Sequence, residues 1–473
     1  MNDKANFQAF EQAINKVVSF FSKIPKDETI RLISHLDADG ISSAALMIKA
    51  LNRLGYFYVL TILPQLKESD IKSFADEDYK YYVFTDLGSG QLLSIRELMQ
   101  DKVVFVLDHH QPQINEVMIN NNIFHINPHL FGFNGSTELS GSGTTFFFIK
   151  SLDKRNEELA DIALIGVVGD VMDPRVGLNN KILDIAIKHN KIKVITGLRV
   201  FGAQTKPLYK TLVQSSDFYI PGVTGSESGA IQFLKQIGVE PKVNGKWRRI
   251  IDLSDEELKR LVAGIVMLRV NEESPEDILG DVYLLTREKE GSPLKDLKEF
   301  ATVLNACGRL GKASYGIGAC LGDERLKRLA INVLDDYKKE IINGMRWVES
   351  HHNSEFVIEE PGFLIVNAQN NILPTVIGTV ASMLSRSASV ADNTFILTMA
   401  RIDAKHTKIS LRFKGKRDSL NLKEVLESII KKFDGEAGGH HHAAGAYISV
   451  EQEQAFIEEA KRVLGSIAVE EKI

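Results

Sequence analysis

The chain has 473 residues, 44% of them hydrophobic and 25% charged, so two or three domains of an ordinary soluble globular protein are expected. Its formal net charge of −5 argues against nucleic-acid binding through bulk positive charge, so any such binding needs a local basic patch. The only cysteines are Cys307 and Cys320, and neither a membrane-spanning apolar run nor an apolar signal core occurs, which excludes a disulfide scaffold and predicts a cytoplasmic protein without a membrane partner.

Within a predicted first domain, 1–195, the first 150 residues alternate short apolar runs with helical stretches. Residues 28–34, 81–86 and 102–108 are predicted strands, and a helix is expected from Ser42 to Leu54. This alternation predicts an α/β fold with a mostly parallel sheet and helices on its faces. Each of the three runs ends in an aspartate or reaches one within a few residues. Because ligands of open α/β sheets bind beyond the carboxyl ends of the strands, these acids are expected to meet at one edge.

The rest of the chain divides into a middle region, 196–345, and a last domain, 346–473. The middle region is predicted to be mainly helical and to end in a long connector helix at 324–350. Alternation then returns and predicts a smaller α/β domain. Its expected elements are a strand at 363–368, a helix at 375–385, strands over 394–413, a helix at 420–433, a glycine-histidine turn and a final helix at 451–465.

Aspartates and histidines gather after the predicted strands of the first domain. Taken singly, each has a structural explanation, because an aspartate at a strand end commonly caps a turn or helix and a histidine pair in a loop is usually solvated. Their joint occurrence predicts a metal site, since Mn²⁺ and Mg²⁺ prefer carboxylate oxygens and imidazole favours Mn²⁺ or another transition metal. A carboxylate that bridges two cations is expected where two metal ions hydrolyse a phosphate ester. The set is His35, Asp37, Asp39, Asp86, Asp108, His109, His110 and Asp170.

Four segments resemble, in chain order, the four motifs of the DHH phosphoesterase superfamily. They are HLDADGISSA from His35, FTDLGSG from Phe84, LDHHQP from Leu107 and GVVGDVMD from Gly166. The resemblance implies a mostly parallel-sheet DHH domain, 1–195, and a smaller α/β DHHA1 domain, 346–473, joined by the long helix and the middle region. The overall layout resembles the archaeal RecJ-like nucleases, including the GINS-associated nuclease type.

The same resemblance implies roles for the clustered residues. Two divalent cations would be bound, preferably Mn²⁺, with Mg²⁺ or Co²⁺ as substitutes. Asp86 would bridge them, and Asp108 would orient the neighbouring histidines. His110 would face the scissile phosphate, and the nucleophile would be a water whose pKa the cations lower. One cation would be held by His35, Asp37 and Asp86, and the other by Asp39, Asp86, His109 and Asp170.

Residues far along the chain are expected to bind substrate. Residues 401–417 contain seven Lys or Arg and one Asp, which a solvated strand pair would also explain, but an arginine fork suits bidentate contact with phosphate. The order K-x-S-x-R and the stretch GGHHHAAG resemble the DHHA1 signature, and NACGR resembles a stretch of RecJ-type nucleases. Ala437 stands where relatives tend to have a first of three glycines. The implied contacts are Asn305, Arg309, Lys408, Ser410, Arg412, Gly438, Gly439 and His440.

Two roles are open for Ser140–Thr145, which has the composition of a helix start. Its amides would either bind substrate phosphate at a helix N-terminus or serve as a plain helix cap.

Three functions fit these observations. The first is a single-strand-specific exonuclease on DNA or RNA in replication or repair, expected to run 5′→3′ on DNA, with 3′→5′ action on RNA or DNA as the alternative. The second is a small-molecule phosphodiesterase or oligoribonuclease, although such relatives tend to be shorter. The third is a replisome scaffold that uses the middle region, with the GINS complex or a repair helicase as partner. The complete set of metal ligands argues against a purely structural role.

Overall fold

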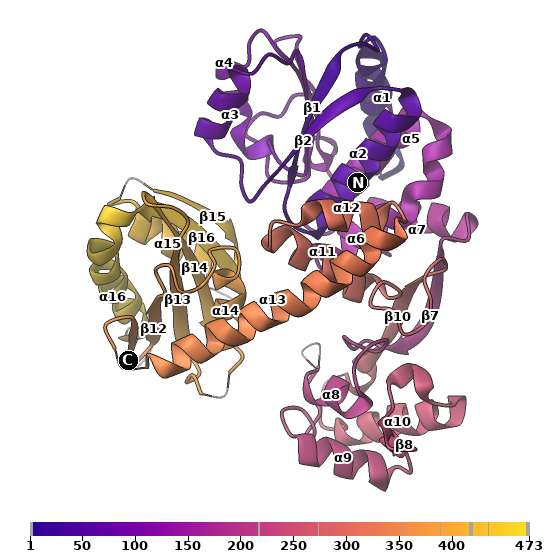
Figure 1. The fold of residues 1–473 in the computed structure, drawn as a ribbon, viewed down its shortest axis with the longest axis vertical. Coiled ribbons are helices and arrows are strands. Elements are labelled where there is room, and N and C mark those ends of the chain that lie inside the picture. The colour runs from indigo at the N-terminus through magenta and orange to yellow at the C-terminus, as the bar shows by residue number, and fades with distance from the viewer. Residues whose placement is uncertain are drawn as a thin grey trace. The chain divides into compact units, whose positions relative to one another are not determined.

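The computed structural model describes residues 3–215, 218–272, 274–352, 354–387, 389–415, 420–433 and 435–469. The chain forms two compact units, Met1–Val333 and Leu334–Ile473, whose elements are labelled in Figure 1. Both units combine a sheet with helices, which confirms the predicted α/β class. Among the described residues, no helix is both long and apolar enough to cross a membrane.

The first unit is built on a six-stranded sheet of order β2-β1-β3-β4-β6-β5. Its first five strands in this order pair in parallel, and the edge strand β5 runs antiparallel to β6. The strand order reverses at β1, which lies between β2 and β3, and such switch points are where open α/β sheets bind ligands. The strands are β1 (Thr29–His35), β2 (Phe57–Leu63), β3 (Tyr81–Thr85), β4 (Val103–Leu107), β5 (Met118–Ile119) and β6 (Ile123–Ile126).

Helices cover both faces of this sheet (Figure 1). Side chains of successive strand residues alternate between faces, so Phe84 and Val106 pack with α3 and α4 while Phe105 points the other way. On that second face the ring of Phe21, from α1, lies 5.1 Å from Phe105 and 5.4 Å from Phe148 of α5. The helices are α1 (Asp3–Phe21), α2 (Ala38–Leu54), α3 (Glu68–Ala75), α4 (Leu92–Leu98), α5 (Gly141–Leu152), α6 (Ala160–Gly169) and α7 (Gly177–Lys188).

Helix α2 begins at Ala38 rather than at the predicted Ser42. The side chain of Asp37 caps it by accepting a hydrogen bond of 3.0 Å from the Gly40 amide. The early aspartates and glycine, which suggested a loop, therefore form the first turn of the helix. This shift places Asp39 on the helix and His35 on the strand before it.

Within the first unit, most of the middle region lies between two antiparallel strands, β7 (Ile192–Leu198) and β10 (Leu279–Leu285). Between them lie mainly helices around a small apolar core, as predicted. A short hairpin, β8 (Lys242–Val243) and β9 (Lys246–Trp247), accompanies them. The helices of this part and those that follow are α8 (Leu208–Val213), α9 (Glu227–Gln236), α10 (Asp255–Leu268), α11 (Leu297–Arg309), α12 (Ala313–Cys320) and α13 (Glu324–Ser350). Helix α13 has the bounds of the predicted connector.

The second unit has a mixed sheet of order β11-β12-β13-β14-β16-β15. Strands β12 and β13 are parallel, and the other neighbours are antiparallel. Its apolar core lies between the sheet and helices α15 and α16. The elements are β11 (Val357–Glu360), β12 (Phe363–Asn367), α14 (Ile377–Leu384), β13 (Thr394–Arg401), β14 (His406–Lys414), α15 (Leu422–Ile430), β15 (Glu436–His440), β16 (Ala443–Ser449) and α16 (Glu453–Val469).

The glycine-histidine turn predicted at 438–440 is wrong, because these residues belong to strand β15. Gly438 pairs with Gly445 and Gly439 pairs with Ala444 of β16. Gly439 has φ +133°, and a Cβ there would lie 2.4 Å from the carbonyl oxygen of Ala443. Glycine at this position therefore allows β15 and β16 to approach closely and does not form a turn.

Helix α11 packs directly on the segment between β1 and α2. A Cβ on Gly308 would lie 1.6 Å from the carbonyl oxygen of Leu36. We expect Gly308→Ala to lower the free energy of unfolding by about 3 kcal/mol or more, because the clash is with backbone that cannot yield. Thermal unfolding measures this.

The matched control is Gly465→Ala in α16, where an added Cβ would meet Phe363 at an ordinary 3.6 Å. There alanine should be neutral or slightly stabilising through its helix propensity. Equal melting temperatures of Gly308→Ala and the wild type would contradict the close packing of α11.

Candidate metal centre

The structure brings the eight predicted aspartates and histidines together at the carboxyl end of the first unit's sheet. Three strand ends and two helix ends contribute to this cluster. His35 ends β1, Asp37 caps α2, Asp39 lies in the first turn of α2, Asp86 follows β3, Asp108, His109 and His110 follow β4, and Asp170 caps the end of α6.

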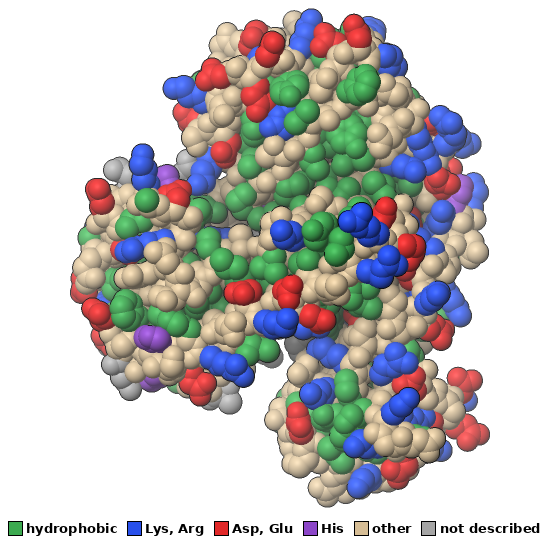
Figure 2. All heavy atoms as spheres, viewed as in Figure 1, with side chains coloured by type: hydrophobic (Ala, Val, Ile, Leu, Met, Phe, Trp, Pro, Cys, Tyr) green, Lys and Arg blue, Asp and Glu red, His purple; other side chains and the backbone are tan. Residues whose placement is uncertain are grey.

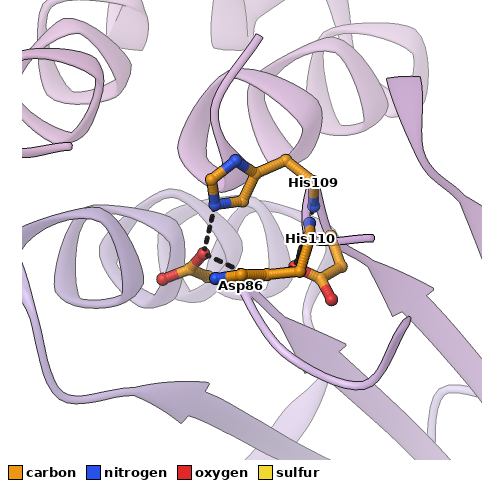
Figure 3. Close-up of side chains that lie close together, drawn as sticks. Asp86, His109 and His110 are labelled. Carbon is orange, nitrogen blue, oxygen red and sulfur yellow. Dashed lines mark hydrogen bonds and ion pairs between the residues drawn. The ribbon is translucent and has the colours of Figure 1, made fainter. Parts of the chain in front are cut away.

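Asp86 occupies the middle of the cluster. Its Oδ2 lies 3.4 Å from Nδ1 of His35, and its Oδ1 lies 3.2 Å from Nε2 of His109. Figure 3 shows the contact with His109 and the neighbouring His110. The side chain is 1% exposed, and the backbone is left-handed with φ +58°. Each oxygen therefore faces a different histidine, as a carboxylate that bridges two cations must.

The first group of donors consists of His35, Asp37 and Asp86. Nδ1 of His35 lies 2.9 Å from Oδ2 of Asp37. Nε2 of His35 lies 3.3 Å from the carbonyl oxygen of Pro64 and donates to it, because a carbonyl only accepts. The lone pair of Nδ1 is therefore directed at the two carboxylates. Ligand atoms about 3 Å apart are what an octahedral cation with bonds of about 2.1 Å requires.

The second group adds His109, Asp39 and Asp170 to the other side of Asp86. Nε2 of His109 lies 3.3 Å from Oδ2 of Asp170 and 3.9 Å from Oδ2 of Asp39. Nδ1 of His109 donates to the carbonyl oxygen of Gly135 at 2.6 Å, which leaves the lone pair of Nε2 for the cluster. Backbone carbonyls thus orient both histidines, an arrangement typical of metal ligands.

The N-terminus of α5 holds the carboxylate of Asp39. Asp39 accepts hydrogen bonds from Ser140 Oγ at 2.9 Å, the Gly141 amide at 2.7 Å and the Ser142 amide at 3.1 Å. Ser140 also caps the helix by accepting from the Gly143 amide. Of the two roles open for this segment, the helix cap is present, and its first amides bind a protein carboxylate.

Burial of like charges shifts the pKa values of this cluster. Burial and the nearby charge of Asp86 raise the pKa of Asp39 to about 7. Burial and the charge of Asp39 likewise raise the pKa of Asp170. Burial also opposes ionisation of Asp37, but His35 outweighs it and lowers the pKa of Asp37 well below its usual range. The neighbouring carboxylates also raise the pKa values of His35 and His109 despite their burial, so in the metal-free protein these two rings supply positive charge to the cluster.

Unsatisfied buried atoms give an independent test of whether cations fit. Nδ1 of His35, both carboxylate oxygens of Asp86 and Nε2 of His109 are buried and make no well-formed hydrogen bond to any described residue. A buried polar atom without a partner costs about 1–3 kcal/mol. These atoms are the ones that a cation in either group would ligate. Their number, chemistry and spacing fit divalent cations.

A buried hydrogen-bond network supports Asp108 and His110. Asp108 accepts from the Ser89 amide at 2.9 Å and from Nδ1 of His110 at 2.8 Å. Ser89 Oγ lies 2.9 Å from Nε2 of His125, and Asn127 donates to Ser89 Oγ and to the carbonyl oxygen of His110. Burial lowers the pKa of His125 to about 4, so its ring is neutral.

Sequence reasoning missed Ser89, His125 and Asn127. Ser89 lies inside FTDLGSG, but His125 and Asn127 follow β4 by many residues and carry no local pattern. Their roles depend on the pairing of β4 with β6, which brings residues 125–127 beside Asp108.

Two of the predicted substrate contacts lie in the first unit. Asn305, on α11, accepts a hydrogen bond of 3.0 Å from the Ala38 amide at the start of α2. Arg309 is the last residue of α11 and is half-buried. Asn305 thus contacts the segment that carries Asp37 and Asp39, and its contact with substrate stays a prediction.

The other predicted contacts lie in the second unit. Lys408, Ser410 and Arg412 alternate along β14, so they share one face of the sheet. Ser410 pairs with Gly445, which pairs with Gly438, and this row of small residues crosses three strands. Arg412 donates to Ser382 Oγ of α14 at 3.0 Å and to the carbonyl oxygen of Leu411. The side chain of His440 lies outside the described part of the structure.

Comparison with known proteins assigns family domains to most of the chain. The model of the DHH family, N-terminal domain, matches residues 29–167, the DHH-CID domain matches 200–282 and the DHHA1 domain matches 361–466. An uncharacterized protein of Methanocaldococcus jannaschii is 31% identical over 445 residues, which cover 92% of this chain and 93% of that protein.

Several solved structures share the fold at low sequence identity. Exonuclease RecJ bound to manganese has a TM-score of 0.56 at 16% identity, covering 96% of this chain and 94% of that one. RecJ of Thermus thermophilus with Mn²⁺ has a TM-score of 0.57 at 16% identity; the match covers 96% of this chain and spans 55% of that protein. CDC45 of Entamoeba histolytica has a TM-score of 0.61 at 12% identity, covering 97% and 99%.

Stability of the metal-free protein should fall as pH rises from about 5.5 to 8. Asp39 holds a proton up to about pH 7 in the folded chain but only to about pH 4 when unfolded, so its stabilising contribution is lost as pH rises. The raised pKa values of His35 and His109 act in the same direction. Melting temperatures in chelator measure this.

Added Mn²⁺ should raise the melting temperature most at high pH, because a cation needs the ionised carboxylate. In the metal-free Asp39→Asn variant, the melting temperature should fall less steeply with rising pH than in the wild type. Two results would contradict the proposed metal site. One is a melting temperature of the metal-free protein that rises between about pH 5.5 and 8, and the other is a melting temperature that does not change when Mn²⁺ is added.

Proposed function

The chain belongs to the DHH family and has the RecJ-like DHH and DHHA1 architecture, and from this we propose that it is a metal-dependent exonuclease of single-stranded nucleic acid. The family and the fold support a phosphoesterase or nuclease. The observation that carries the proposal is Asp86, whose two oxygens face His35 and His109 in separate donor groups. Such an arrangement suits hydrolysis of phosphodiesters.

Two divalent cations are proposed for the centre, with Mn²⁺ preferred and Mg²⁺ or Co²⁺ as substitutes. When bound, they would lower the pKa of water and neutralise charge on the phosphate. RecJ structures of the same fold contain Mn²⁺ or Mg²⁺, which supports this choice. The proposed ligands of one cation are His35, Asp37 and Asp86, and those of the other are Asp39, Asp86, His109 and Asp170.

His110 is proposed to act on the substrate itself. Its side chain is 43% exposed, and its Nδ1 donates to the buried carboxylate of Asp108. Burial opposes a charged ring, but Asp108 raises the pKa of His110 above its usual value. The protonated ring would therefore stabilise charge on the phosphate and supply a proton to the leaving oxygen through Nε2. Asp108 positions the ring, and Ser89 and Asn127 hold Asp108 and the His110 backbone.

Asn305 and Arg309 of the first unit are proposed to contact the single-stranded nucleic acid, and further contacts are proposed for residues of the second unit. Among the described residues, a Cβ on Gly438 would meet nothing within 4 Å, whereas Ser410 is buried beside α14, so the room above this row of the sheet lies at its Gly438 end. Lys and Arg are interspersed with acidic side chains over α8 to α10 on the face seen in Figure 2. Together with the net charge of −5, this favours binding through local contacts over binding through one large basic surface. The proposed contacts of the second unit are Lys408, Ser410, Arg412, Gly438, Gly439 and His440.

The proposed direction is 5′→3′ on single-stranded DNA, in replication or repair. The test is digestion of end-labelled single-stranded DNA and RNA, blocked at either end, with Mn²⁺. Release of mononucleotides only from strands with a free 5′ end is expected. Release only from free 3′ ends would reverse the direction, and activity confined to dinucleotides would favour a small-molecule phosphodiesterase. Binding of the GINS complex or a repair helicase stays a further proposal.

Removing the bridging carboxylate should stop catalysis. We expect Asp86→Ala to abolish turnover in this assay while the chain still binds single strands, because the proposed strand contacts lie elsewhere. Fluorescence anisotropy with a labelled oligonucleotide measures the binding. Full activity of Asp86→Ala would contradict the bridging role.

Removing the proposed acid should spare the metal ligands. His110→Gln should lower kcat about 100-fold or more, because acid catalysis commonly contributes that much. Mn²⁺ affinity, followed by calorimetry, should stay near that of the wild type. A kcat within twofold of the wild type would rule out the role of His110. His189→Gln, at the end of α7, is the matched control and should leave kcat unchanged.

A further inference from the structure

The end of helix α6 differs from five other helix ends of the first unit in the residue that closes it, which is a valine rather than a glycine or an asparagine. In all six, a residue with left-handed backbone closes the helix, and its amide and the next one donate to carbonyls three and five residues back, respectively. Glycine is the usual residue there, and asparagine is tolerated. The closing residues are Gly55 in α2, Gly238 in α9, Gly311 in α11, Gly322 in α12, Asn190 in α7 and Val171 in α6.

Valine is an unfavourable residue for this position. Its φ is +61°, and a β-branched side chain in this conformation crowds the backbone. The side chain is 93% exposed, so packing within the first unit recovers almost nothing. Glycine would relieve the strain, as it does at the ends of α2, α9, α11 and α12.

The loop that follows keeps Val171 in this conformation. Asp173 accepts from the Arg175 amide at 2.8 Å and from the Tyr283 hydroxyl at 3.3 Å. Arg175 in turn donates to Asp281 at 2.6 Å. Tyr283 and Asp281 belong to β10, so this strand fixes the loop from outside the helix. Strain that the surroundings impose in this way is commonly found at functional sites.

Val171 directly follows a proposed metal ligand. Oδ2 of Asp170 lies 3.3 Å from Nε2 of His109 in the second donor group. Because consecutive Cα atoms are about 3.8 Å apart, the backbone of Val171 adjoins the second donor group, where a phosphate would bind under the proposed function. A nucleotide next to that phosphate offers apolar surface on its sugar and base.

We propose that Val171 is a substrate-contacting residue, whose exposed isopropyl group packs against the nucleoside adjacent to the scissile phosphate. This proposal rests on the proposed function. It explains why an exposed apolar side chain stands at a strained position where glycine would be more stable. The contact would favour correct placement of the strand over the centre.

The test compares Val171→Gly with the wild type on a single-stranded oligonucleotide with Mn²⁺. The melting temperature should rise by about 2 °C, because strain is relieved. KM should rise about tenfold, because the apolar contact is lost, while kcat stays within twofold. Val171→Leu keeps an apolar group and should keep KM near that of the wild type.

Asn190 provides the matched control, because it closes α7 with the same hydrogen bonds. Asn190→Val should lower the melting temperature by about 2 °C and leave KM unchanged. This variant introduces the strain without touching the centre.

Each outcome bears on a separate statement. An unchanged KM in Val171→Gly would overturn the substrate contact, even with a raised melting temperature. If the melting temperature of Val171→Gly does not rise above that of the wild type, Val171 is not strained in the native chain. If the wild type cleaves no single strand, the proposed function fails first and removes the substrate that the contact needs.

Discussion

Mutual repulsion among buried carboxylates is the constraint on which the first unit depends. Asp37, Asp39, Asp86 and Asp170 converge where β1 and β3 end, and Asp39 and Asp86 have almost no exposed surface. Burying like charges together is unfavourable unless donors or cations compensate. Hydrogen-bond donors of the backbone compensate part of this charge. The Gly40 amide donates to Asp37, and the first amides of α5 donate to Asp39.

Small residues allow those donors to come close enough. A Cβ on Gly141 would lie 2.6 Å from Oδ1 of Asp86, and one on Gly166 would lie 2.4 Å from Oδ1 of Asp39. Helices α5 and α6 can therefore press their backbone against the carboxylates, where side chains would intervene. What remains uncompensated is the set of atoms around Asp86, and the proposed cations would supply the missing charge. The stability of this unit and its proposed chemistry thus depend on the same atoms.

Local patterns in the sequence were enough to predict much of this structure. The strands that end in aspartate and the connector helix 324–350 were predictable because apolar periodicity is a local property. The start of α2 and strand β15 were not predictable, because the glycines in both segments also suit turns. The cap by Asp37 fixes the start of α2, and the pairing with β16 makes residues 436–440 a strand. The support of Asp108 by His125 and Asn127 depends on distant strand pairing, which no single segment encodes. The clustering of the aspartates and histidines was inferable, because parallel strands end at one edge.

The proposed two-metal centre, with Asp86 as its bridge, is tested most directly by anomalous diffraction from crystals of the chain grown with Mn²⁺. Two anomalous peaks about 3.5–4 Å apart are expected, one on each side of the Asp86 carboxylate, with His35 beside one and His109 beside the other. A single peak, or two peaks that do not share Asp86, would contradict the bridged centre.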